Sequence, residues 1–191
     1  VTLYAMRKGH ISTTVFNKWE FEKCLDEISL SFKKESPTSK AEMYLNGENV
    51  EGVIRTMEVS ELVSSVATIS SVRTKLVEQQ QQMGKGKGVV MDGRDIGTVV
   101  FPDAELKIFM NASAEKRAKR RYDELVERGD VVTYLEVLEN VIERDHIDTT
   151  REDSPLIKAQ DAIEIDNSEM NKEDQFHIIL QLAKDRIAGR A

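Results

Sequence analysis

The sequence predicts an α/β protein with a small antiparallel sheet inserted into it. Two apolar runs, residues 88–91 and 106–110, are separated by a charged stretch that contains glycine, and short apolar runs of this kind predict buried strands. The dipeptide Asn46-Gly47 between two short β-type segments is the strongest local signal for a hairpin. Because open parallel sheets bind ligands at their strand ends, the stretch between the two apolar runs is the first candidate site.

The composition limits the class of protein. The chain has 191 residues, of which 40% are hydrophobic and 32% charged, and its formal net charge is −7. This length predicts one core domain with an insertion, and the acidic balance argues against nucleic-acid binding. No apolar run approaches the length of a membrane span. The lone cysteine, Cys24, excludes an intramolecular disulfide and fits the reducing cytoplasm. We also expect a monomer.

The first part of the chain predicts helices on either side of the inserted sheet. Residues 1–8 have a helical pattern that ends at Gly9, a suitable C-cap, and a short helix is expected at about 19–26. Residues 58–82 are helical in pattern, in one or two pieces. This order of elements predicts that the sheet lies between two helical segments.

The inserted sheet is predicted over residues 25–53. Apolar and polar residues alternate over 28–32, which predicts a half-exposed strand, and a turn is expected at 36–39. The hairpin at Asn46-Gly47 completes the antiparallel arrangement. The expected core residues of this insertion are Trp19, Phe21 and Phe32.

The second part of the chain predicts a linker, a helix that Ser113 begins, a strand and a final helix. Residues 84–88 are rich in glycine and lysine and indicate a solvated linker. Ser113 can cap the helix that follows it. Residues 162–166 predict the last strand, and Asn171 begins a C-terminal helix whose expected buried residues are Phe176, Ile179, Leu180 and Leu182.

The candidate site follows the first predicted strand. Asp92, Arg94 and Asp95 lie between the turn residues Gly93 and Gly97. A surface turn held by a local Arg–Asp pair would also explain this stretch. Three ionisable residues at one strand end are more than a turn requires, so a functional site is favoured.

Four motifs make the sequence similar to bacterial cytidylate kinases: residues 54–59, 92–104, 117–121 and 144–151. The resemblance extends from residue 1 to about residue 187. It implies a P-loop NTPase-like nucleoside monophosphate kinase, with a parallel sheet flanked by helices, an antiparallel insertion and a helical lid. It also implies transfer of the γ-phosphoryl group of ATP to CMP or dCMP, with Mg²⁺.

The resemblance implies a division into domains. The core comprises residues 1–24, 54–132 and 154–191, the monophosphate-binding insertion residues 25–53, and the lid residues 133–153. The family's phosphate loop, GxxxxGK[ST], is not found in these 191 residues. We therefore expect the first strand and this loop to lie upstream of the chain; the other explanation is that the protein has lost its ATP-binding loop.

Several arginines are candidates for contact with phosphates. Residues 116–121 are strongly basic, and Arg117 and Arg121 share a helix face. This face could simply be solvated and paired with nearby carboxylates. The resemblance places this helix at the start of the lid and implies contact with ATP by at least one of Arg117, Arg120 and Arg121.

A second stripe has Arg144, Asp148 and Arg151 at positions i, i+4 and i+7 of a helix. A salt-bridge ladder within the helix is the simpler explanation. The resemblance implies that the arginines meet phosphoryl oxygens or base when the lid closes, and that Asp148 holds Arg144 or a ribose hydroxyl. His146 lies off this stripe and is expected at the surface.

The resemblance also assigns the acceptor side. Arg55, Ser64 and Arg73 match family positions that face the acceptor nucleotide, although an exposed helix with scattered polar residues would look similar. The resemblance implies three further roles. Arg94 would hold the acceptor phosphate, Asp95 would accept a hydrogen bond from the cytosine amino group or orient Arg73 and Arg94, and Asp92 would order waters on Mg²⁺.

Two other functions remain open at this point. A chain without the phosphate loop could bind CMP without transferring phosphate. A kinase for another nucleoside monophosphate would carry a similar set of residues. Finding a GxxxxGK[ST] loop upstream in the reading frame would exclude the first alternative. Turnover measured with a panel of nucleoside monophosphates would test the second.

Overall fold

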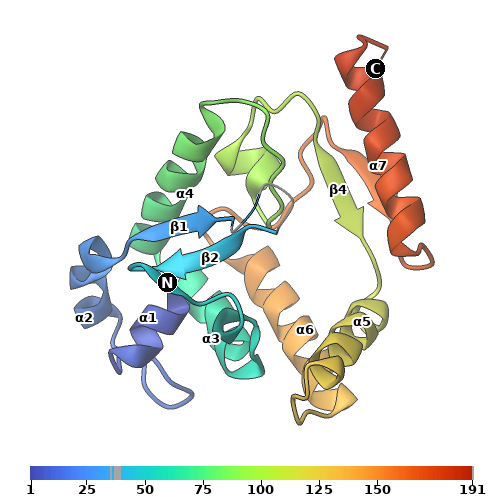
Figure 1. Cartoon of the computed structure of the whole chain (residues 1–191). Coiled ribbons are helices and arrows are strands. Elements are labelled where there is room, and N and C mark those ends of the chain that lie inside the picture. The colour runs from blue at the N-terminus through green and yellow to red at the C-terminus, as the bar shows by residue number, and fades with distance from the viewer. Residues whose placement is uncertain (35, 37–39, 191) are drawn as a thin grey trace. The chain divides into compact units, whose positions relative to one another are not determined.

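The computed structural model describes residues 1–34, 36 and 40–190. They form two compact units, Val1–Lys75 and Leu76–Ala191, each of which can be followed by its colours in Figure 1. Most of the predicted turn at 36–39 falls outside the described residues. In the described part of the chain, none of the helices is long and apolar enough to cross a bilayer.

The first unit combines short helices with a three-stranded antiparallel sheet, and both predicted features are confirmed. The predicted long helical segment forms two helices that break after Ala67. The elements are α1 (Thr2–Arg7), α2 (Lys18–Lys23), η1 (Leu25–Glu27), β1 (Leu30–Lys33), β2 (Glu42–Leu45), β3 (Glu48–Asn49), η2 (Val53–Arg55), α3 (Met57–Ala67) and the first turns of α4 (Ser70–Gly84).

The hairpin between β2 and β3 forms where the sequence predicts it. Asn46 and Gly47 have φ values of 49° and 87°, the left-handed conformation that a two-residue hairpin requires at both positions. Glycine adopts this conformation without strain and asparagine tolerates it, which explains the dipeptide. The turn sets the register, in which Leu45 pairs with Glu48 on β3 and with Leu30 on β1.

The predicted core of the insertion is right for Phe21 and wrong for Trp19 and Phe32. Phe21 is fully buried, whereas Trp19 is 68% exposed and Phe32 is 55% exposed. In the short helix α2, residues 19 and 21 are two positions apart and so project from opposite sides. The exposed indole ring instead lies under the Lys23 ammonium, whose nitrogen is 2.9 Å from the ring centroid.

Phe21→Ala is expected to lower the free energy of unfolding by about 3–5 kcal/mol, because it leaves a cavity in the core of the first unit. Chemical denaturation measures this change. Trp19→Ala is the matched control, and we expect it to cost less than about 1 kcal/mol because the ring is already exposed. Equal losses for the two variants would contradict this description of the core.

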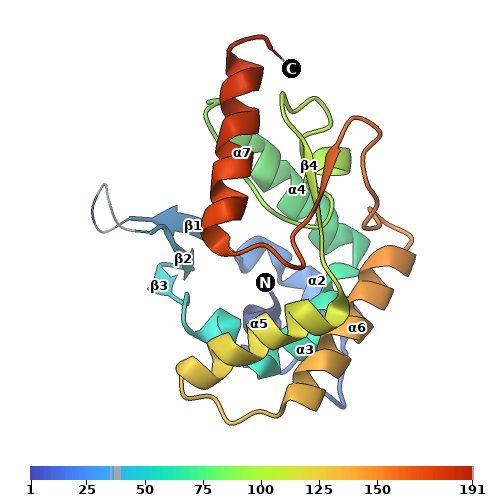
Figure 2. The ribbon, with the colours of Figure 1, turned by 90° about the vertical axis from the view of Figure 1, so that its right-hand side faces the viewer.

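The second unit is built around two parallel strands. β4 (Ile108–Asn111) pairs with β5 (Ile163–Asp166), and Ile108 lies opposite Ile163. Between them the chain forms α5 (Ala114–Glu127) and α6 (Tyr134–Thr150), which pack side by side (Figures 1 and 2). The predicted strands over 106–110 and 162–166 are thus confirmed, with small shifts of their ends.

Helix ends in this unit follow local hydrogen bonding. The Ser113 hydroxyl accepts a hydrogen bond from the Lys116 amide at the start of α5, as predicted. Thr133 and Glu136 cap each other at the start of α6. Asn171 caps α7 (Lys172–Ile187) as expected. These caps satisfy backbone N–H groups that a helix leaves without partners at its start.

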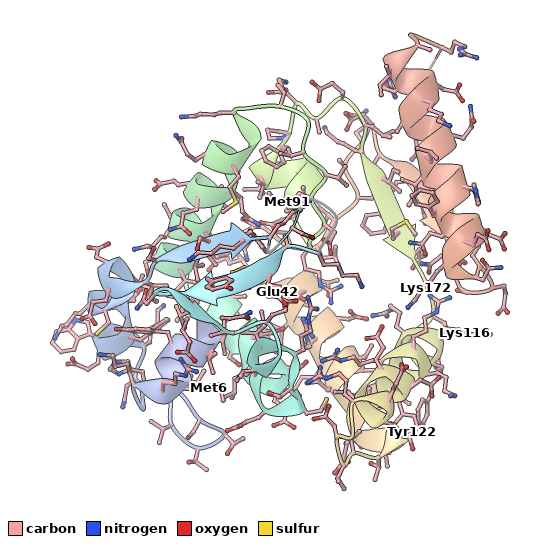
Figure 3. The ribbon with its side chains drawn as sticks, in the orientation of Figure 1. Met6, Glu42, Met91, Lys116, Tyr122 and Lys172 are labelled. Atoms are coloured by element: carbon pink, nitrogen blue, oxygen red, sulfur yellow. The ribbon has the colours of Figure 1, made fainter. Side chains whose placement is uncertain are left out.

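The prediction of a strand over 88–91 is wrong. Residues 88–92 have no regular secondary structure, and the Val90 side chain is 100% exposed. Met91, labelled in Figure 3, lies in this stretch. A strand persists only where neighbouring strands take up its backbone hydrogen bonds. Among the described residues, β4 and β5 pair with each other and with no part of this run.

The turn predicted around Gly93 and Gly97 takes the form of one wide helical turn, η3 (Ile96–Val100). The Phe101 amide donates to the Ile96 carbonyl at 2.7 Å, five residues back. A Cβ atom at Gly93 would lie 2.9 Å from the Ile96 side chain, which would have to shift to make room for it. The charged residues of this stretch therefore lie beside a hydrogen-bonded turn.

Two further predictions about this unit need correction. Gly84 belongs to the end of α4 rather than to the linker, and a Cβ atom there would lie 2.3 Å from the Phe101 ring. Residues 85–88 are exposed, as expected of a linker. In α7, Phe176 is 60% exposed and no described side chain is fully buried. Periodicity marks an apolar face, but burial needs another layer against it.

Candidate functional site

Arg94 lies beside two carboxylates of α6. Its Nε atom is 3.2 Å from Oδ2 of Asp148, and its Nη1 atom is 3.9 Å from Oδ1 of Asp145. The Arg94 side chain is 37% exposed, so its guanidinium is held on one side and open to solvent on the other. An arginine held in this way is prepared to receive an anion with its remaining N–H donors.

Asp148 and Arg151 form a buried ion pair at the end of α6. Nη1 of Arg151 donates to Oδ1 of Asp148 at 2.7 Å, and the two side chains are only 3% and 4% exposed. The Arg151 Nε atom also donates to the Ser154 carbonyl, and the Leu156 amide donates to the Asp148 carbonyl. Asp148 thus holds both Arg94 and Arg151, and the segment that leaves α6 folds back onto the helix.

Arg117 of α5 is fixed at three points. Its two terminal nitrogens donate to the two oxygens of Asp145, at 3.0 and 2.5 Å, and its Nε atom donates to the Ala112 carbonyl at 3.0 Å. The neighbouring Arg121 makes an ion pair of 3.6 Å with Glu124. Arg117 is therefore held by α6 and by the segment that follows β4.

Arg144 lies in the same electrostatic cluster. Burial lowers the pKa of its guanidinium, and the nearby charges of Arg94 and Arg121 lower this pKa further, while Asp148 and Asp145 raise it. Arginine nevertheless stays protonated in proteins, so the group remains a cation. A partly buried cation beside other cations is stabilised by an incoming anion, which favours phosphate at this position.

Arg120 of α5 lies against the segment that follows β5. Its guanidinium donates to the Asn167 side chain and carbonyl, at 3.2 and 2.6 Å, and to the carbonyls of Ser168 and Met170, each at 3.3 Å. Nearby, Lys116, labelled in Figure 3, pairs with Glu169 at 2.9 Å. Arg120 therefore holds the loop between β5 and α7.

Arg120→Met is expected to loosen this loop, because three backbone carbonyls lose a charged donor. Hydrogen bonds to charged groups contribute about 1.5–3 kcal/mol to stability. We therefore expect the free energy of local opening of this loop to fall by about that amount. Hydrogen exchange of the amides of residues 166–171 measures it. The control is Lys119→Met, since Lys119 pairs with Asp123 on the surface of the same helix. Unchanged exchange in the Arg120 variant would contradict the role.

The first unit holds the three predicted acceptor residues. Nε of Arg55 donates to Glu51 at 2.8 Å in an exposed ion pair, and Nη1 of Arg73 donates to the Ala67 carbonyl at 3.3 Å. The Ser64 side chain is buried on α3, and its hydroxyl has no hydrogen-bond partner among the described residues. A buried hydroxyl in that condition is an expected contact for a ligand or water.

The two predicted aspartates before η3 differ in exposure. Asp92 is exposed, whereas Asp95 is half-buried, and the carbonyl of Asp95 accepts the amide of Val99 at 2.9 Å. Asp95 therefore anchors the backbone of η3 in addition to any role of its side chain.

The sequence alone did not identify Asp145 as a site residue. This carboxylate accepts two hydrogen bonds from Arg117 and lies near Arg94. A signal was present, because Asp145 precedes Asp148 by three positions on a helix and so shares its face. Its partner Arg117 is 28 positions away, and no spacing rule connects residues at that separation. His146, in contrast, is exposed as predicted.

Comparison with known proteins identifies the family. A sequence profile described as Cytidylate kinase matches residues 1–185. The chain is 62% identical to a cytidylate kinase of Flavobacterium johnsoniae over 185 residues, which is 97% of this chain and 80% of that protein. It is 53% identical to a cytidylate kinase of Bacteroides fragilis over 175 residues, 92% of this chain and 76% of that protein. The chain belongs to the cytidylate kinase family.

This result confirms the resemblance predicted from the four motifs. Cytidylate kinases are P-loop nucleoside monophosphate kinases, so the predicted enzyme class is confirmed as well. The fold is confirmed at a coarser level, as an α/β structure with a two-stranded parallel sheet and a three-stranded antiparallel sheet. The arginine cluster of the second unit lies within the residues that the cytidylate kinase profile matches.

Proposed function

We propose that the protein transfers the γ-phosphoryl group of ATP to CMP or dCMP, giving CDP or dCDP. The proposal depends on a cluster of charged side chains in the second unit of this cytidylate kinase chain. The cluster contains four guanidinium groups and two carboxylates. The members are Arg94, Arg117, Arg144, Arg151, Asp145 and Asp148.

The cluster suits phosphoryl transfer. The transition state spreads negative charge over the transferred oxygens, so the protein mainly has to supply position and positive charge. The attacking group is a phosphate oxygen of the acceptor, which is already ionised near neutral pH. A strong general base is therefore not required, in agreement with a cluster composed of arginine and aspartate.

On the acceptor side, Arg94 would hold the phosphate of CMP through the N–H groups that its aspartates leave open. Asp95 would accept a hydrogen bond from the cytosine amino group or orient Arg73 and Arg94. Ser64 and Arg55, which belong to the first unit, are assigned to contacts with the acceptor nucleotide. The buried Ser64 hydroxyl supports this assignment, since a nucleotide would give it a partner.

On the donor side, Arg144 and Arg151 would compensate the charge that develops during transfer, with Arg117 and Arg121 nearest to the polyphosphate. Asp148, which already contacts Arg94 and Arg151, would hold Arg144 or a ribose hydroxyl. Burial, and after it the charges of Arg94 and Arg121, lower the pKa of the Arg144 guanidinium, and a bound phosphate would offset both effects.

Mg²⁺ fits the chemistry of this site. Magnesium prefers oxygen ligands and in kinases is bound by one or two carboxylates together with the phosphates of the substrate. Asp92 is an exposed carboxylate and would meet the ion through water. The ion, when bound, would neutralise phosphate charge during transfer.

The chain would comprise three functional parts: an insertion, a lid and a core. Residues 25–53, which include the three-stranded sheet, would form the monophosphate-binding insertion, and residues 133–153, which include α6, would form the lid. Residues 1–24, 54–132 and 154–191 would form the core. Closure of the lid would exclude water and so prevent simple hydrolysis of ATP.

The test is a substrate panel with the protein as its gene encodes it. We expect ADP formation with CMP and dCMP in the presence of ATP and Mg²⁺, and much slower turnover with AMP, GMP and UMP. Equal turnover with another monophosphate would replace the proposed acceptor. Without any turnover, calorimetric binding of CMP alone would identify a CMP-binding module, as the GxxxxGK[ST] motif is missing from these 191 residues.

A further inference from the structure

Asp145 of α6 is the member of the cluster for which the proposed transfer names no individual role. It accepts two parallel hydrogen bonds from Arg117, at 3.0 and 2.5 Å, and its Oδ1 atom is 3.9 Å from Nη1 of Arg94. Two cations from different segments thus approach one carboxylate. The Asp145 side chain is 28% exposed, so the group lies at the border between the cluster and solvent.

The contact fixes the plane of the Arg117 guanidinium. Two N–H groups bind the carboxylate in the fork geometry that arginine favours, and a third binds the Ala112 carbonyl. On the exposed face of α5, Lys119 pairs with Asp123 as a point charge without such a fork. The Arg117–Asp145 and Lys119–Asp123 pairs therefore differ in how strictly they orient the cation.

We propose that Asp145 is a positioning residue that orients Arg117 and Arg94 for the phosphates and partly neutralises them before nucleotide binds. This inference rests on the proposed function. The carboxylate has two separable effects. It restricts the rotation of the guanidinium groups, which matters in the transition state, and it offsets positive charge, which weakens the binding of any anion in the ground state.

These two effects predict opposite changes when the charge is removed. Asp145→Asn keeps the size of the side chain but cannot accept the Arg117 fork with both atoms. We expect kcat to fall by about 10- to 100-fold, because a small misplacement of a catalytic group costs about that much. We expect the affinity for inorganic pyrophosphate to rise by about three- to tenfold, because one negative charge near the anion is lost.

The experiment measures kcat and KM for CMP and ATP, and separately the affinity for pyrophosphate by calorimetry. Asp123→Asn is the matched control, since it removes a surface carboxylate from α5. We expect this control to change neither kcat nor the pyrophosphate affinity by more than about twofold. The calorimetric measurement needs no turnover, so Asp145 is tested even if the proposed reaction fails.

Two results would overturn the inference. One is a wild-type kcat in the Asp145→Asn variant. The other is a lower kcat together with weaker pyrophosphate binding, which would indicate that Asp145 only supports the packing of α5 on α6. If Asp145→Asn does not fold, Asp145→Glu decides the matter: we expect unchanged pyrophosphate affinity with a lower kcat, and a wild-type kcat would overturn the proposal.

Discussion

Replacement of Arg94 by alanine is expected to lower kcat/KM for CMP by about a thousandfold, in the range that single arginines contribute to phosphoryl transfer. Arg94 is the proposed anchor of the acceptor phosphate, and its guanidinium is half-open to solvent beside Asp148 and Asp145. Steady-state kinetics with ATP and CMP measure the change. The fold should persist, because Asp148 keeps its buried partner Arg151.

Two variants control this prediction. Arg94→Lys keeps the positive charge but loses the planar fork, so we expect it to recover only a small part of the activity. Arg186→Ala removes an exposed arginine of α7 and should leave kcat/KM within about twofold of the wild-type value. An Arg94→Ala protein with nearly full activity would remove the central assignment of the proposed site.

Asp148→Asn is expected to lower the free energy of unfolding by about 3–5 kcal/mol, because it leaves a buried guanidinium without its carboxylate. Arg151 is 3% exposed, so water cannot replace the lost charge. Urea denaturation of the variant and the wild-type protein measures the difference. The exposed pair of Lys119 and Asp123 provides the control, and Asp123→Asn should cost less than about 1 kcal/mol.

A double variant separates charge from packing in this prediction. Asp148→Leu together with Arg151→Met removes both members of the buried pair and replaces them by apolar side chains of similar size. Such replacements are often neutral or stabilising, so the double variant should be more stable than Asp148→Asn. If the double variant is as unstable as Asp148→Asn, the unpaired buried charge is not the cause of the lost stability.

Local signals in the sequence predicted local structure well. The hairpin at Asn46-Gly47 and the caps at Ser113 and Asn171 depend on hydrogen bonds or backbone conformations within a few residues. Such features are decided before distant parts of the chain meet. The motifs also predicted the family, which the comparisons confirm, and named most members of the arginine cluster.

Contacts between distant residues could not be predicted in the same way. A basic run on α5 indicates a charged face, but only the packing of α5 on α6 pairs Arg117 with Asp145. The approach of β5 and its following loop gives Arg120 its carbonyl partners. A long charged side chain can reach several partners. The partner that it binds therefore depends on which backbone segments lie nearby.

The sequence by itself therefore determined the family, the helix caps, the hairpin and the residue types of the site, because these follow from composition, spacing and neighbours along the chain. The tertiary structure alone decided which carboxylate holds each arginine and which apolar residues are covered. Trp19 and Val90 are exposed although they are apolar, since burial requires a second surface and not only a hydrophobic side chain.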